Sequence, residues 1–252
     1  MKIKLELETT YEADLAQTID ISIPLIPGSE GPKCFWAPHF DAVPVKEGEF
    51  IGDTTQGGSV NFKNVLLNPH GNGTHTECVG HIATEKATIN QTLNNYHFIA
   101  QLVTFFPTKM DDGDRIITLE QIKTLKLHPN VEALVVRTMP NNDDKLQRNY
   151  SGTNPPYFDP EAIHQIKNLG IKHLLIDLPS VDREEDEGKL ASHKAFWNYP
   201  SYFDKEKTIT ELIYVADTVA DGLYLLNLQI ASFEIDASPS KPVLYNLEKI
   251  NV

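Results

Sequence analysis

The stretch DPEAIHQIKNLGIKHLLIDLP, residues 159–179, predicts a helix that is followed directly by a buried strand. The helix carries signals for its start, its buried face and its end: Asp159 as N-cap, Pro160 at the first helical position, Ile163 and Ile166 on one apolar face, and Gly170 at the end. Residues 171–179 are apolar and short, as expected for a strand that is covered on both faces. A helix joined to a buried strand is typical of an α/β fold.

Strand-like patterns dominate the rest of the chain. Alternating or continuous apolar character predicts strands at 2–8, 18–25, 98–106 and 132–138, and the C-terminal part, 222–247, returns to strand-like patterning. A second, weaker helix is predicted at 118–127. The polar stretch 139–160 is interpreted as a long surface loop rather than a linker between domains, because neither flanking segment looks able to fold by itself. We therefore expect one mixed α/β domain over residues 1–252, with more strand than helix.

Composition and charge exclude several classes of function. The chain has 252 residues, with 22 basic and 35 acidic side chains, which gives a formal charge of −13. Nucleic acid and anionic membranes require a concentrated basic surface, so neither is expected as a partner. With only Cys34 and Cys78 there is no disulfide framework, and the N-terminus lacks an apolar signal core. We expect a cytoplasmic protein with reduced cysteines.

The densest group of chemically active side chains is HGNGTHTECVGH, residues 70–81. If residues 75–77 are extended, the side chains of His75 and Glu77 leave the same face of the strand. An imidazole and a carboxylate on one face suit Zn²⁺ or a similar divalent ion and leave space for water or substrate. A lone histidine is usually structural, but three within twelve residues, around an acid and among glycines, favour a metal site.

Two further members of this stretch are harder to place. His70 has the opposite parity to His75, but the neighbouring glycines favour an irregular backbone that could return its ring to the same ion. Cys78 also has the chemistry of a metal ligand. Its parity points it away from His75 and Glu77, so we interpret it as a small buried apolar residue.

This stretch resembles the signature of the cyclase superfamily of metal-dependent hydrolases, which includes bacterial kynurenine formamidase. Gly73, Thr74, His75 and His81 match the family pattern at the expected spacing. The sequence differs from the family pattern in three ways. His70 lies five residues before His75 where the family has four, Glu77 replaces an aspartate, and Val79 replaces a proline.

Other segments agree with the same family in order and approximate position. IDLPSVD (176–182) and LVVRT (134–138) are similar to family strands, ASHKAFW (191–197) to the segment with a downstream histidine, and ITELIYVAD (209–217) to the segment with a metal-site glutamate. The resemblance covers about residues 18–230. It implies a strand-rich α/β domain of the swivelling β/β/α type.

The resemblance also implies roles for individual residues. One or two divalent ions, Zn²⁺ or Mn²⁺, would be held by His70, His75, Glu77, His193 and Glu211. His81 corresponds to the catalytic histidine, which moves a proton between water and the leaving nitrogen. No nucleophilic serine is required, so Ser180 is interpreted as structural, while Asp177 and Asp182 would orient the site or cap a turn.

The implied activity is metal-dependent hydrolysis of the C–N bond of an arylformamide or a cyclic amide, a small-molecule substrate, by metal-activated water. Phe35 and Trp36 are candidates for binding an aromatic substrate, although simple core packing explains them equally well. Two alternatives stay open: a lactone hydrolase or cyclase at the same site, and a metal-containing small-molecule-binding protein without turnover. The resemblance further implies a homo-oligomer.

Overall fold

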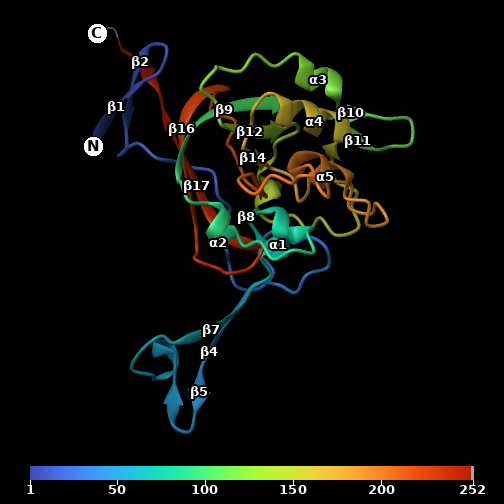
Figure 1. The fold of residues 1–252 in the computed structure, drawn as a ribbon. Helices are drawn as coiled ribbons and strands as arrows, with labels where there is room; N and C mark the ends of the chain where they lie inside the picture. Colours follow the sequence, from blue (N-terminus) through green and yellow to red (C-terminus); the bar gives the residue numbers. More distant parts are fainter. Residues whose placement is uncertain (251–252) are drawn as a thin grey trace.

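The central sheet of the computed structural model, which describes residues 1–250, is closed into a barrel (Figure 1). Its strands follow the spatial order β16 (Gly222–Ile230), β9 (His97–Phe105), β12 (Ala133–Thr138), β14 (His173–Ile176), β15 (Thr208–Glu211), β8 (His75–Glu77), β17 (Ala237–Asn246) and β3 (Ile19–Asp20). Because β16 also pairs with β17, seven strands form the barrel, and β3 extends the sheet from β17.

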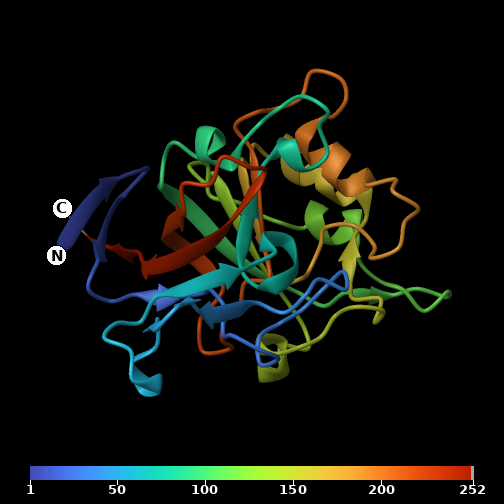
Figure 2. The same ribbon diagram turned by 90° about the horizontal axis from the view of Figure 1, so that it is seen from below.

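Three of the seven strand pairs in the barrel are parallel and four are antiparallel. Strands β9, β12, β14 and β15 run parallel to one another, and β8, β17 and β16 complete the barrel through antiparallel pairs. Parallel neighbours need a crossover connection. Helices α3 (Leu119–Lys123), α4 (Pro160–Asn168) and α5 (Ala191–Trp197) provide it, and they cover one side of the barrel, opposite the chain termini (Figures 1 and 2).

Alternation along the buried strands separates two hydrophobic cores. On β12, Leu134 and Val136 pack with the helices, in a cluster that includes Ile163 and Trp197. Their neighbours Ala133 and Val135 face the barrel interior with Leu102 and Leu226. A strand that is covered on both faces needs apolar residues at successive positions, which explains the continuous apolar runs in the sequence.

Most of the predicted elements are confirmed. Helix α4 begins at Pro160, and the Asp159 carboxylate accepts a hydrogen bond from the backbone of Glu161 as an N-cap. Helix α3 begins with a capping box at Thr118 and is shorter than the predicted 118–127. The stretch 18–25 contributes only the two-residue strand β3 and an isolated bridge at Ser22, and the N–H of Ile23 donates a hydrogen bond to the hydroxyl of Thr74.

Short elements complete the fold. Outside the barrel lie β1 (Lys2–Glu6), β2 (Thr10–Asp14) and β18 (Glu248–Lys249) in one small sheet, β10 (Thr108–Lys109), β11 (Arg115–Ile117) and β13 (Tyr157–Phe158) in another, and the one-turn helices α1 (Pro69–Asn72) and α2 (Ile89–Thr92). Three 3₁₀ turns are η1 (Thr54–Gln56), η2 (Val79–His81) and η3 (Asp143–Leu146), the last lying inside the predicted loop 139–160.

A β-hairpin projects from the body of the molecule (Figure 1). It is built from β4 (Asp41–Pro44) paired with β7 (Lys63–Leu66), and its far end carries β5 (Lys46–Glu47) and β6 (Phe50–Ile51). We refer to residues 41–66 as the arm. Nothing in the sequence pattern had predicted it, because its strands are short and polar residues interrupt them.

Candidate metal centre and active site

Strand β8 places two of the predicted ligands on one face. It is bordered by β15, where Glu211 lies opposite His75, and by β17, where Ala237 lies opposite Glu77. Side-chain atoms of His75, Glu77 and Glu211 all lie within 4.8 Å of one another. Thr76 points the other way, and its hydroxyl is 2.8 Å from that of Thr210. The expected alternation along residues 75–77 is therefore confirmed.

The irregular backbone before β8 returns His70 to this cluster. Helix α1 is a single turn capped by Asn68, whose side chain accepts a hydrogen bond from Gly71 N–H. A Cβ at Gly71 would lie 2.3 Å from the Cβ of Ala37, so only glycine allows this close packing. Nδ1 of His70 lies 3.1 Å from Oε2 of Glu77. The structure thus brings His70 to the predicted ligands.

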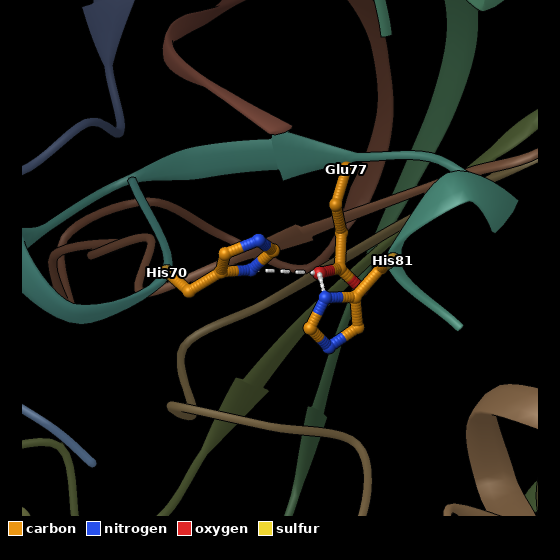
Figure 3. Close-up of side chains that lie close together, drawn as sticks. All are labelled: His70, Glu77 and His81. Carbon is orange, nitrogen blue, oxygen red and sulfur yellow. Dashed lines mark ion pairs between the residues drawn. The ribbon is translucent and has the colours of Figure 1, made fainter. Parts of the chain in front are cut away.

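His81 lies at the end of the turn η2. Its Nδ1 is 3.9 Å from Oε2 of Glu77, and its ring centroid is 4.3 Å from that of His70. Figure 3 shows both rings directed at the same carboxylate, with the second nitrogen of His81 pointing away from it. Glu77, His75 and Glu211 are buried, whereas His81 remains partly open to solvent.

His193 closes the cluster from helix α5. Its Nε2 lies 3.2 Å from Oε1 of Glu77, and its Nδ1 lies 2.6 Å from Oδ2 of Asp182. The same Asp182 carboxylate accepts hydrogen bonds from the backbone N–H groups of Ser192 and His193, so it caps the helix and orients the ring together. On β15, Glu211 lies 3.4 Å from Nε2 of His75.

Burial and neighbouring charged groups shift the pKa values of His70, Glu77 and His193 in opposite directions. Burial alone would lower the pKa of His193, but hydrogen bonds to Asp182 and Glu77 outweigh it and raise that pKa to about 10. His70 behaves alike: burial is outweighed by Asp236 and Glu77, and its pKa rises to about 10. Burial would raise the pKa of Glu77, yet the surrounding imidazoles hold it well below its usual range. These carboxylates require nearby positive charge.

Two atoms in the cluster indicate how that charge is supplied. Within residues 1–250, Nε2 of His75 and Oε2 of Glu77 are buried without a hydrogen-bond partner, although Oε2 of Glu211 lies 3.4 Å from the former and Nδ1 of His70 lies 3.1 Å from the latter. An unpaired buried polar atom is costly unless it binds something. Imidazole nitrogen and carboxylate oxygen are both ligands for Zn²⁺ and similar ions. The residues present therefore fit a divalent metal ion.

A cavity of about 330 Å³ opens beside the cluster. Its lining includes His70, His81, His193 and Glu211, together with Phe35 at the mouth. Trp36 is not among the lining residues. It is 61% exposed, and its ring lies against Gly152. The structure thus brings only the first of the two predicted substrate-binding aromatics to the site.

Asp236 is a member of the site that the sequence did not reveal. Its Oδ2 lies 2.8 Å from Nε2 of His70 and 3.4 Å from Nδ1 of His81. Asp236 immediately precedes β17, so its proximity to the histidines depends on the pairing of β17 with β8, elements about 160 residues apart in the chain. No local pattern around residue 236 signals that pairing.

Two other polar residues after β14 have structural contacts. Asp177 accepts hydrogen bonds from Thr138 and the buried Lys145 ammonium, so it lies in a separate buried network. The hydroxyl of Ser180 accepts a hydrogen bond from the backbone of Asp182, which fits the structural role expected for it. Cys78 is fully buried in the barrel core, as expected for a small apolar residue.

The fold and the site together define a strand-rich α/β barrel with a histidine–carboxylate cluster at the edge of a cavity. The chain belongs to the Cyclase family, whose model matches residues 13–183. That match includes the residues from His70 to Asp182 and ends before His193 and Glu211.

Similar proteins carry related names. A kynurenine formamidase of Geobacillus thermodenitrificans is 26% identical over 172 residues, which are 67% of this chain and 69% of that protein. A protein described as a predicted metal-dependent hydrolase of Bacillus stearothermophilus has a TM-score of 0.64 at 18% identity, over 91% of this chain and 98% of the other. Isatin hydrolase A of Labrenzia aggregata has a TM-score of 0.65 at 14% identity, over 93% and 94%. The predicted fold class is confirmed.

Proposed function

We propose that the protein is a metal-dependent hydrolase that cleaves the C–N bond of an arylformamide or a cyclic amide. The observation that carries this proposal is the pair of unpartnered buried atoms, His75 Nε2 and Glu77 Oε2 among the described residues, beside a cavity that also contains His81. The names of the similar proteins, kynurenine formamidase and isatin hydrolase, support the choice of amide substrates.

One or two divalent ions, Zn²⁺ or Mn²⁺, would be held by His70, His75, Glu77, His193 and Glu211. Such an ion supplies Lewis-acid chemistry, because it lowers the pKa of water and polarises a carbonyl oxygen. The ring of His193 is kept in place by Asp182, through the 2.6 Å contact at Nδ1. The hydroxyl of Ser180 accepts a hydrogen bond from the backbone N–H of Asp182, and the nucleophile of the proposed reaction is water rather than a serine.

His81 is the proton carrier of the proposed reaction. It lines the cavity and is the least buried of the four histidines of the cluster, with its side chain 30% exposed against 24% for that of His70. A histidine suits this role because its ordinary pKa lies near neutrality. His81 takes a proton from the attacking water and delivers it to the leaving nitrogen, which an amine needs in order to depart.

The experiment is a substrate panel on protein of defined metal content. Protein loaded with Zn²⁺ or Mn²⁺ is assayed with an N-formyl aromatic amine, a ring-fused cyclic amide and an aromatic lactone. We expect amide hydrolysis that a chelator abolishes and added metal restores. Activity on the lactone alone would make the protein a lactone hydrolase. Metallated protein inert to all three substrates would indicate a binding protein.

We also propose that the protein acts as a homo-oligomer, with the arm as part of the contact between copies. The arm exposes the apolar side chains Val43, Phe62, Val65 and Leu66. A two-stranded ribbon is marginally stable in water on its own, and exposed apolar patches of this kind are typical of interfaces. No helix within the described part of the chain is long and apolar enough to cross a membrane.

A further inference from the structure

Asp236 occupies a position behind the two histidines at the cavity wall. Its Oδ2 faces Nε2 of His70 at 2.8 Å and Nδ1 of His81 at 3.4 Å. The ring of His81 therefore has one nitrogen directed at carboxylates, while the other points away from Glu77 (Figure 3). A ring held through one nitrogen presents the other in a fixed direction and in a fixed tautomer.

The backbone that carries Asp236 is fastened to the turn that carries His81. The carbonyl of Asp236 accepts a hydrogen bond from Cys78 N–H at 3.0 Å, one residue before η2 begins. A Cβ on Gly80 would lie 3.3 Å from the Cβ of Asp236 and 2.1 Å from the carbonyl oxygen of Ala87. The Ala87 carbonyl therefore restricts this position to glycine, and the Asp236 segment packs closely beside it.

A second anchor holds the same segment from the other side. The carbonyl of Ile235 accepts a hydrogen bond from Ile89 N–H at 2.8 Å. Glu234 accepts hydrogen bonds from the side chains of Thr88, Asn90 and Gln91, around helix α2. Residues 234–236 are therefore tied to both η2 and α2, so the carboxylate of Asp236 has little freedom to turn away from His81.

We propose that Asp236 is a positioning residue for His81, which holds the imidazole by Nδ1 so that Nε2 is the atom that exchanges protons with substrate. This inference rests on the proposed role of His81 as the proton carrier. The distance of 3.4 Å is long for a hydrogen bond, and catalytic hydrogen bonds commonly shorten when substrate binds. An aspartate that orients a histidine in this way fixes its tautomer and stabilises the protonated ring that forms during the reaction.

The test begins with Asp236→Asn, which keeps the shape of the side chain and removes its charge. We expect kcat to fall about 10- to 100-fold, as for other residues that orient a functional histidine, while KM and the metal content stay at the wild-type values. Asp111→Asn, an exposed aspartate in the turn between β10 and β11, is the matched control and should change neither constant. Thermal unfolding of both variants shows that they fold.

A double-mutant cycle separates positioning of His81 from other roles. On a His81→Ala background, Asp236→Asn should cause no further loss of kcat, because the residue acts through the ring that has been removed. Full additivity of the two losses would overturn the proposal. Loss of bound metal in Asp236→Asn, in proportion to the loss of kcat, would also overturn it and assign the effect to His70.

Nuclear magnetic resonance of the histidine side chains provides a readout that does not depend on activity. In Zn²⁺-loaded protein, the resonances missing from His81→Ala assign the ring, and we expect its proton on Nδ1. In Asp236→Asn the proton should shift toward Nε2. If this shift occurs but no amide is hydrolysed, the positioning holds and the proposed function fails. An unchanged ring would contradict the positioning itself.

Discussion

Strands β7 and β8 lie close together in the sequence, yet they reverse the usual preferences for burial. All four residues of β7 are exposed, among them Val65 and Leu66, which are 61% and 58% exposed. All three residues of β8 are buried, although they are His75, Thr76 and Glu77. Apolar residues normally occupy the interior, and an unpaired buried charge is costly.

The two exceptions have different physical meanings. The polar strand is buried because its side chains meet other polar groups: Glu211, His193 and His70 surround the Glu77 carboxylate or the His75 ring. Val65 and Leu66 of β7 are exposed because the arm projects from the body of the molecule, so their apolar side chains need another surface to cover them. The comparison therefore predicts that β8 acts through an ion and β7 through another protein surface.

Removing the polar strand's ligands should have the largest effect. We expect the double variant His75→Ala, Glu77→Ala to lose bound metal and hydrolytic activity together, because it deletes both unpartnered atoms. Ligand binding stabilises a folded protein by about 2.7 kcal/mol at a concentration one hundred times Kd. Zn²⁺ should therefore raise the melting temperature of the wild type and leave that of the variant unchanged. Elemental analysis and thermal unfolding measure both, and equal metal in the two proteins would contradict the site.

The next effect separates binding of the ion from proton transfer. His81→Ala should keep most of the metal, since its ring is partly exposed and lies 3.9 Å from Glu77, and should lose about 10²- to 10⁴-fold in kcat. His75→Ala, the matched comparison at a buried position, should lose metal and activity together. Metal loss in His81→Ala equal to that in His75→Ala would make His81 a ligand rather than a proton carrier.

The sequence allowed much of the site to be predicted because β8 is a local feature. The alternation of His75 and Glu77 depends only on an extended backbone, and the resemblance to the family added His193 and Glu211 from their order in the chain. Asp236 could not be predicted in this way, since its place beside His70 depends on strand pairing between distant segments. Local pattern determines which face a side chain leaves, but not which strands become neighbours.

The same distinction holds for the fold. Helix α4 and strand β12 carry their own signals and were predicted close to their observed bounds. Strand β15 has only four residues, three of them polar, and is completely buried, so its sequence resembles a loop until β14 and β8 are placed on either side of it. Helix α5 begins at Ala191, after Leu190 in a left-handed conformation at the N-cap position. Asp182 supplies the cap from the preceding loop, so a local N-cap signal is missing.

Substitution of Val65 on β7 tests the proposed contact between copies of the protein. We expect the wild-type protein to sediment as an oligomer and Val65→Asp to shift it toward the monomer, because a charge would enter an apolar contact. Gln17→Asp adds the same charge at an exposed position outside the arm and should leave the assembly intact. Sedimentation velocity at several concentrations measures both. A monomeric wild type would contradict the proposal that the exposed apolar side chains of β7 contact another copy of the protein.

The smallest effects are expected for two neighbouring aromatic residues, Phe35, which lines the cavity, and Trp36, which is exposed. Phe35 and Trp36 both adopt positive φ angles, 54° and 52°, a strained conformation for bulky residues. Turning the chain in this way sends Phe35 to the cavity wall and Trp36 outward over Gly152.

If Phe35 contacts the aromatic ring of the substrate, loss of that apolar contact is worth about 1.5 kcal/mol. Phe35→Ala should then raise KM about tenfold with kcat unchanged, as expected when a contact is equally strong in the ground and transition states. Trp36→Ala should leave both constants nearly unchanged, because its ring lies outside the cavity. Steady-state kinetics on an N-formyl aromatic amine measures both variants. A rise in KM for Trp36→Ala equal to that for Phe35→Ala would show that the exposed aromatic also contacts the substrate, contrary to its position outside the cavity.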